Sequence, residues 1–247
     1  MKRYFLALIV VGCLLANAGH ASQDDLAAEK KRVLDATQMT GEVAAKNLNE
    51  MIEFSGIDAE EVFDIIEKRL SAEMADKNKA EEMAWLAKTL ALSGNKKYQN
   101  TLIAARDKSN SKLKDHSIIA LARLDQFAQY NPILRKNLQA APAGGLERQR
   151  VLNALESELP DLVRWGAKRV FYALYMDRGL VQTSFATLKT MLPKAKSDDE
   201  IDAVAWLIKG VGAYGVAEEK DFIRQIIADK NNDYPKKIIK YAKISLK

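Results

Sequence analysis

The sequence predicts an all-α protein that contains a duplicated helical unit, and three observations support this fold class. Long stretches are rich in Ala, Leu, Glu and Lys, which favour helix, and the 247 residues include only 5 prolines and 12 glycines. No segment alternates Val, Ile, Thr and aromatic residues in the manner of a strand. A motif near residue 84 recurs near residue 205, which indicates an internal repeat.

The composition is that of a folded protein with a weak basic excess. Hydrophobic residues make up 48% of the chain and charged residues 29%, which is typical of a globular protein. The formal net charge is +5, and it falls to +3 if Lys2 and Arg3 are removed with a leader. Nucleic-acid-binding proteins concentrate basic charge much more strongly, so we expect no nucleic-acid partner.

The first residues have the layout of a secretory signal peptide. Two basic residues precede an apolar run from Tyr4 to Leu15, which is too short to span a bilayer comfortably. Small residues follow, and cleavage after Ala18 or Ala21 would fit the small-residue rule. We therefore expect residues 1–21 to be a signal peptide, and the mature chain to reach the periplasm without a transmembrane span.

The alternative for the leader is a lipid anchor on Cys13. The segment Val10-Val11-Gly12-Cys13 is similar to the lipobox of bacterial outer-membrane lipoproteins, in which the cysteine is lipidated. Against it, Leu14 and Leu15 continue the apolar run where a polar tether is expected. Since Cys13 is the only cysteine, ordinary cleavage leaves a mature chain without a disulfide.

Two copies of one helical unit are predicted after an N-terminal helix or cap at residues 22–40. The copies, residues 41–126 and residues 163–247, match at an offset of 121 around the Trp-containing motif. There, 84–94 shares five of eleven residues with 205–215, including Ala84-Trp85-Leu86 and Lys88. The flanks match at an offset of 122, where Ala45 and Lys46 correspond to Ala167 and Lys168.

Capping residues predict where individual helices begin and end. Asp58, with a glutamate three residues later, and Ser197, followed by three acids, predict helix starts. Pro235 suits the first turn of a helix. Gly94 and Gly215 follow apolar stripes and are predicted C-caps, where a positive φ costs glycine little.

A connecting region is predicted between the two copies. Residues 127–162 are expected to form connecting helices, interrupted by a turn or hinge at residues 142–145. This segment reads Pro-Ala-Gly-Gly, and such clusters of proline and glycine mark turns.

Two motifs resemble HEAT repeats. The segment Pro160-Asp161-Leu162-Val163-Arg164, followed by Ala167, resembles the opening of the second helix of a HEAT repeat, and the Leu113–Leu124 stretch is similar to its later part. From about residue 41 to 247, the chain thus resembles exported, bacterial HEAT-like proteins. The resemblance implies an α-solenoid of stacked helical hairpins that binds along an extended surface. It implies no shared catalytic residue and no cofactor.

Few residues suited to catalysis are present. His20 lies in the leader, so His116 is the only histidine of the mature chain. The mature chain therefore has too few histidines and cysteines to form a metal site from these residue types. His116 corresponds to Ile238 in the second copy, which favours a structural role. The carboxylates cluster in first helical turns, where the helix dipole favours them. We therefore predict a non-enzyme; a cell-wall glycan enzyme would need two of these acids in one cleft.

The aromatic residues have two interpretations. Trp85 and Trp206 recur at matching positions, which favours a place in the core or at its edge, and stacking on a sugar or other ligand is the alternative. Phe171, Tyr172 and Tyr175 are expected to cluster on one helix. Their large area could anchor an interface, while core packing between the copies is the other interpretation.

Lysine-rich segments complete the predicted interaction surface. Its basic members are Lys96, Lys97, Lys112, Lys114, Lys236, Lys237, Lys240 and Lys243. Such groups attract acidic proteins, anionic lipids or lipopolysaccharide, and a solvated face is the plain alternative. The sequence as a whole predicts a non-enzymatic periplasmic scaffold for an unidentified protein partner. The alternatives are an envelope-associated binder of anionic lipid or lipopolysaccharide, and an accessory or enzyme of cell-wall glycan metabolism.

Overall fold

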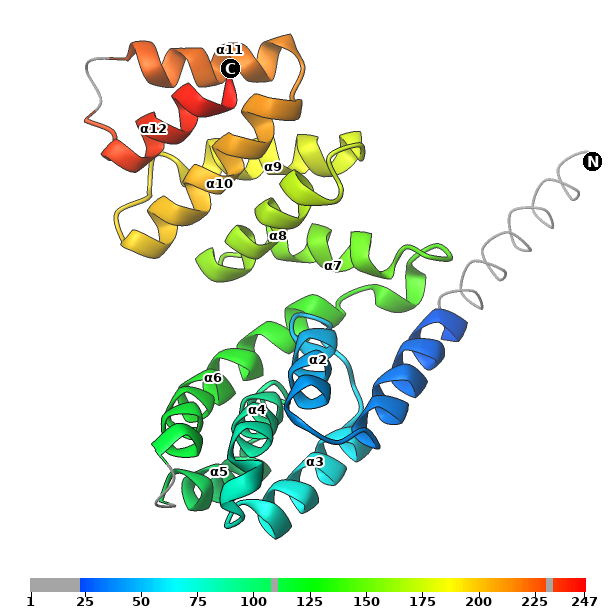
Figure 1. The fold of residues 1–247 in the computed structure, drawn as a ribbon. Helices are drawn as coiled ribbons and strands as arrows, with labels where there is room; N and C mark the ends of the chain where they lie inside the picture. Colours follow the sequence, from blue (N-terminus) through cyan, green and yellow to red (C-terminus); the bar gives the residue numbers. More distant parts are fainter. Residues whose placement is uncertain (1–22, 108–110, 230–232) are drawn as a thin grey trace, which may run out of the picture. The chain divides into compact units, whose positions relative to one another are not determined.

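All regular structure in the described part of the protein is helical. The computed structural model describes residues 23–107, 111–229 and 233–247 (Figure 1). No strand occurs among them, so the all-α prediction is confirmed. The expected signal peptide, with Cys13, lies outside the described residues. The chain divides into two compact units, Met1–Leu146 and Glu147–Lys247.

The first unit is built around a central helix, α4. Residues 23–37 are helical. They are followed by α2 (Glu42–Ile52), α3 (Glu60–Glu73), α4 (Ala80–Ala91), α5 (Gln99–Arg106) and α6 (Ser111–Arg135). The described residues of this unit also include the 3-10 turns η1 (Lys77–Lys79), η2 (Lys96–Tyr98) and η3 (Leu138–Ala140). Helix α4 packs against α2 and against α6, as Figure 1 shows.

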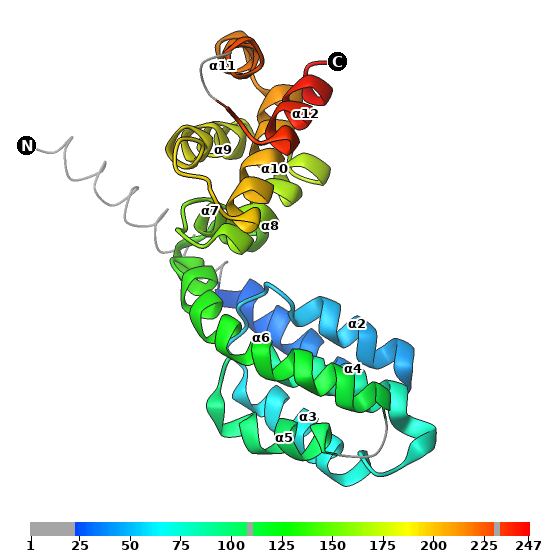
Figure 2. The ribbon, with the colours of Figure 1, turned by 90° about the vertical axis from the view of Figure 1, so that its left-hand side faces the viewer.

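The second unit repeats this plan around α10. Its helices are α7 (Leu146–Leu155), α8 (Pro160–Tyr172), α9 (Arg178–Met191), α10 (Asp198–Tyr214), α11 (Ala217–Ala228) and α12 (Lys236–Ser245), which Figure 2 shows from a second side. Helix α10 packs against α8 and α12 in the way that α4 packs against α2 and α6. The helices α2–α6 of the first unit therefore correspond in order to α8–α12 of the second unit. Their packing is consistent with a helical repeat.

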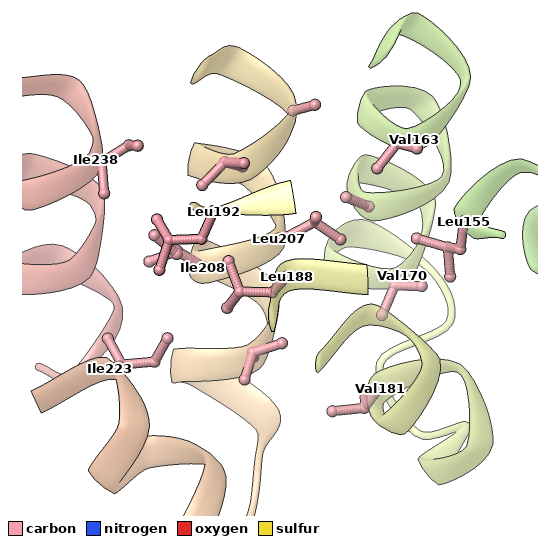
Figure 3. Close-up of a cluster of buried hydrophobic side chains, with 14 of the residues drawn as sticks. Leu155, Val163, Val170, Val181, Leu188, Leu192, Leu207, Ile208, Ile223 and Ile238 are labelled. Atoms are coloured by element: carbon pink, nitrogen blue, oxygen red, sulfur yellow. The ribbon is translucent and has the colours of Figure 1, made fainter. Parts of the chain in front are cut away.

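The core of the second unit gathers around α10. Leu207 and Ile208 of α10 are fully buried, and Figure 3 shows them between Val163 of α8 and Ile238 of α12. Leu188 of α9 joins the same buried cluster. Each outer helix contributes an apolar stripe that α10 covers, and burial of such stripes is the main stabilising contribution to a helical fold.

The segment predicted as a hinge forms a turn held by the N-terminal helix. The backbone N–H of Gly144 donates to a carboxylate oxygen of Asp25 at 2.7 Å. Nearby, Leu26 packs against the small apolar cluster of Leu138, Ala141 and Leu146. Both contacts lie within the first unit.

Helix capping agrees with the prediction at some positions and differs at others. Ser197 caps α10, as predicted, and the structure adds that Glu200 completes a capping box with it. The expected cap at Asp58 is wrong, since α3 begins after Ala59 and has no side-chain cap. The loop before α3 is instead held from α6, because Arg135 donates to the carbonyl oxygens of Gly56 at 2.6 Å and Ile57 at 2.8 Å.

The two predicted glycine caps adopt different conformations. Gly94 has a φ of +63°, as predicted, but Gly215 has an extended backbone with a φ of −69°. Helix α6 also differs from expectation, because it continues through residue 126, where the first copy was expected to end. Pro132 lies inside this helix and omits one backbone hydrogen bond without ending it.

Candidate functional site

The two central helices expose the same narrow stripe. From residue 81 to 90 and from 202 to 211, the pattern of burial is identical, and seven of the ten positions in each helix are buried. The three half-exposed positions are Glu81, Trp85 and Lys88 in α4, and Asp202, Trp206 and Lys209 in α10. Positions spaced by four and three residues share one face of a helix. We call each set an acid–Trp–Lys stripe.

The lysine of each stripe lies over the tryptophan of the same stripe. The Lys88 Nζ atom is 4.5 Å from the centroid of the Trp85 ring, and the Lys209 Nζ atom is 4.4 Å from that of Trp206. An ammonium group within about 6 Å of an aromatic face is attracted by the negative face of the ring. The two stripes thus share their residue types and also their contact geometry.

A second lysine reaches each ring from the preceding outer helix. Lys46 of α2 places its Nζ atom 5.9 Å from the Trp85 centroid, and Lys168 of α8 lies 5.0 Å from that of Trp206. These lysines occupy matching positions of the duplicated sequence. Two ammonium groups therefore converge on one indole in each unit.

The acid of each stripe is paired with a lysine from the last helix. Lys112, in the first turn of α6, forms an ion pair with Glu81. Lys237, in the first turn of α12, pairs with Asp202 at 2.5 Å. The negative end of each stripe is thus neutralised, whereas neither Lys88 nor Lys209 forms an ion pair in the part of the chain that the structure describes.

The environment of the first stripe is electropositive. Partial burial lowers the pKa of Lys88, and the charges of Arg123 and Lys112 lower it further, while the charge of Glu53 acts in the opposite direction. His116 of α6 packs edge-on against Trp85, with ring centroids 5.7 Å apart. Its pKa is lowered by burial and by the charge of Lys88.

The acid of the second stripe connects three helices. Arg164 of α8 lies 3.2 Å from a carboxylate oxygen of Asp202, which Lys237 of α12 also binds. Burial alone would raise the pKa of Asp202, but the ion pairs with Lys237 and Arg164 outweigh it and hold the pKa below its ordinary value. Asp202 therefore stays charged at neutral pH.

In the second unit, the stripe extends into a larger aromatic cluster. Phe171 and Tyr172, at the end of α8, lie 6.1 Å and 5.7 Å from Trp206, and Lys209 lies over Phe171 at 4.2 Å. Tyr172 is 64% exposed. Tyr175 was expected on the same helix, but α8 ends at Tyr172.

Tyr175 joins this cluster through α10 instead. Its ring stacks on Tyr214, at a centroid distance of 5.0 Å. Tyr214 also contacts Phe171, at 5.6 Å. Exposed aromatic area thus surrounds the second stripe, and the first stripe has His116 as its neighbouring ring.

The lysines predicted as an interaction surface have two kinds of environment. Four of them form ion pairs within the chain: Lys96 with Asp125, Lys97 with Glu60 and Asp64, Lys112 with Glu81, and Lys237 with Asp202. The other four, which form no ion pair among the described residues, are Lys114, Lys236, Lys240 and Lys243. The last three line a shallow hollow on α12, with Tyr234, Ile239 and Ile244.

The lysines that contact the tryptophans were missing from the predicted surface. Lys46, Lys88, Lys168 and Lys209 all stand in the duplicated stretches. The useful pattern was a lysine retained at an exposed or half-exposed position of both copies, because packing does not require a particular residue there. Runs of lysine were a poorer guide, since nearby acids pair with them.

Neither a metal site nor a membrane span is found among the described residues. No group of three or more His, Cys, Asp or Glu side chains is arranged there to hold a metal ion. None of the described helices is long and apolar enough to cross a membrane. No family model, curated protein or solved structure matches the chain.

Proposed function

We propose that this protein is a non-enzymatic, HEAT-like α-solenoid scaffold that binds a protein partner through its two acid–Trp–Lys stripes. The observation that carries the proposal is the repetition of the whole arrangement. Each stripe combines one tryptophan, two lysines over its ring and one neutralised acid. Both stripes lie on the central helix of a unit.

Packing alone gives a weak reason for this repetition. Buried positions such as Leu86 and Leu207 must remain apolar, but half-exposed positions accept many residue types. An exposed contact between a lysine and a tryptophan contributes only about 0.5–1 kcal/mol to stability. Tryptophan is, in contrast, among the residues that contribute most to protein interfaces. A binding role explains why both copies keep the pair.

The proposed location is the periplasm. It is supported by the basic start, the short apolar run and the small residues of the predicted signal peptide at residues 1–21. Lipidation of Cys13 is the alternative form of export. Mass spectrometry of the mature protein tests both, because a signal peptide predicts an N-terminus near residue 19 or 22, and a lipoprotein predicts a lipid-modified Cys13.

Crosslinking and pull-down from an envelope extract tests the binding function. The double variant Lys88→Glu/Lys209→Glu reverses the charge at both stripes, and the matched control is Lys68→Glu/Lys194→Glu, at two exposed lysines outside them. We expect a partner that the wild type and the control capture and the stripe variant loses. Equal capture by all three proteins, with unchanged circular dichroism, would contradict the proposal.

A second candidate function is binding of an anionic lipid or lipopolysaccharide through α12. The observation that favours it is the hollow on α12, where Lys236, Lys240 and Lys243 surround Ile239 and Ile244. Ile244 is 48% exposed. Basic groups around apolar side chains suit a headgroup surface. Co-sedimentation with phosphatidylglycerol vesicles, lost in Lys240→Glu/Lys243→Glu, would support this candidate.

A further inference from the structure

We infer that each acid–Trp–Lys stripe binds a carboxylate side chain from an acidic segment of the protein partner, with a neighbouring apolar side chain of that segment against the indole. This inference rests on the proposed function and names the chemistry of the partner. It follows from the charges at the stripes, from the aromatic surface beside them and from the position of the lysines.

The charges at each stripe favour an anion. Two ammonium groups approach one ring, at 4.5 Å and 5.9 Å in the first unit and at 4.4 Å and 5.0 Å in the second. Among the described residues, Lys88, Lys168 and Lys209 form no ion pair, and Glu53, whose charge acts on Lys88, is itself paired with Arg123. Lys46 forms a long ion pair with Glu50, in which the Nζ and carboxylate oxygen atoms are 4.0 Å apart and both side chains are exposed. A carboxylate that reaches Lys88 or Lys209 would accept a charge-assisted hydrogen bond from its ammonium group.

The acid in each stripe does not already provide this carboxylate. Glu81 and Asp202 lie seven residues before the lysine, about 10 Å away along the helix axis. Both are paired with lysines of the last helix, Lys112 and Lys237. The stripe therefore has one neutralised end and one cationic end, and an acidic side chain is complementary to the cationic end.

The aromatic surface beside the lysines favours an apolar neighbour of the acid. Trp206 is surrounded by Phe171, Tyr172 and Tyr241, and Tyr172 is 64% exposed. A peptide whose acidic side chain reaches Lys209 would place its next side chains against these rings. Aromatic anchors of this kind supply much of the affinity of protein interfaces.

The position of the lysines favours a peptide over a membrane surface. Lys88 and Lys209 are half-buried on the central helix, and the helices packed on both sides carry more exposed residues such as Val43 and Ile119. A side chain of an extended peptide can reach such a position. A planar layer of headgroups would first meet the exposed residues of the outer helices.

Fluorescence anisotropy with synthetic peptides tests this inference on the full mature chain. The probe is a labelled peptide of about 12 residues in which Glu alternates with Leu and Tyr, and the comparison peptide carries Gln in place of each Glu. We expect the Glu peptide to bind at least about tenfold more tightly than the Gln peptide, the size expected for one charge-assisted contact. The difference should shrink as salt is raised.

Two matched variants locate the binding. Lys88→Met/Lys209→Met removes both charges and keeps side chains of similar length, and we expect it to lose the preference for Glu. Lys68→Met/Lys194→Met removes the same charge from two exposed positions outside the stripes and should bind as the wild type does. Each single variant at Lys88 or Lys209 should leave the stripe of the other unit active.

The outcomes separate this inference from the proposed function. If the Glu and Gln peptides bind equally, or if neither binds, the inference is wrong. The proposed function then still stands if the charge-reversed stripes lose the partner in the pull-down. If phosphatidylglycerol vesicles bind through Lys88 and Lys209 and the Glu peptide does not, the ligand of the stripes is a lipid and the inference is overturned.

Discussion

Gly94 is a residue whose replacement the surrounding backbone tolerates poorly. Its φ of +63° lies in the left-handed region, and an added Cβ would lie 2.5 Å from the backbone nitrogen of Ala128 on α6. We predict that Gly94→Ala lowers the free energy of unfolding by at least about 2 kcal/mol, from backbone strain and from displacement of α6. Urea denaturation followed by circular dichroism measures the change.

Gly210→Ala is the control for this substitution. Gly210 lies inside α10, and an added Cβ would meet no atom within 4 Å. Since glycine weakens a helix interior, we expect this variant to be more stable than the wild type by about 0.5–1 kcal/mol. Equal losses in both variants would show that the close approach of α6 to Gly94 is not the cause.

His116 should make stability depend on pH. Its folded-state pKa lies below the ordinary 6.5, first because of burial and then because of Lys88. Both states are neutral above pH 6.5. Below that value the unfolded chain binds the proton first, so this contribution to stability is lost as the pH falls from 6.5 toward the folded-state pKa.

His116→Ile tests this linkage, because Ile238 holds the corresponding position of the second copy. We expect the free energy of unfolding of the wild type to fall relative to the variant between pH 7 and pH 5. Urea denaturation at several pH values measures it, with the carboxylates titrating alike in both proteins. Parallel curves over this range would show that His116 does not titrate differently in the folded state.

At the scale of elements, α10 depends on its capping box. The Ser197 Oγ accepts from the backbone N–H of Glu200, and the Glu200 carboxylate accepts from the backbone N–H of Ser197 at 2.9 Å. We predict that Ser197→Ala costs about 1 kcal/mol of stability. Thr190→Ala, on an exposed part of α9 where the hydroxyl donates to the Ala186 carbonyl, should be close to neutral. Thermal unfolding of the two variants compares them.

The helices were predictable from sequence to the extent that their signals are local. The cap at Ser197 needs only residues within three positions, and the helix start there was predicted correctly. The cap at Asp58 was not, because Arg135, more than seventy residues later, holds the preceding carbonyl groups. The continuation of α6 past residue 126 also depends on tertiary contacts. One of them is the pair of hydrogen bonds from Asn131 to the Leu92 and Ser93 carbonyls.

The candidate site was predictable only in part, for a related reason. Repetition in the sequence identified Trp85 and Trp206, but it does not show which polar neighbours lack a partner. From the sequence alone, Lys112 and Lys237 cannot be distinguished from Lys88 and Lys209 as candidates for binding a partner. They differ because carboxylates of the central helix pair with them in the folded chain.

At the scale of the whole molecule, each unit should respond separately to damage in its core. Leu86 and Leu207 hold matching positions of α4 and α10, and both are fully buried. We predict that Leu86→Ala and Leu207→Ala each cost about 2–5 kcal/mol locally. Hydrogen exchange should accelerate within Met1–Leu146 for the first variant and within Glu147–Lys247 for the second. Acceleration across both units in either variant would indicate a single cooperative unit.

The presence of two equivalent stripes on one chain also sets a valency of two. A partner with a single acidic segment would bind either stripe with the modest affinity of a few contacts. A partner with two such segments, spaced to reach both, would make its second contact intramolecularly, at an effective concentration on the order of millimolar. Avidity would then let the protein discriminate between partners by the spacing of their acidic segments, while each separate contact stays weak and quickly reversible.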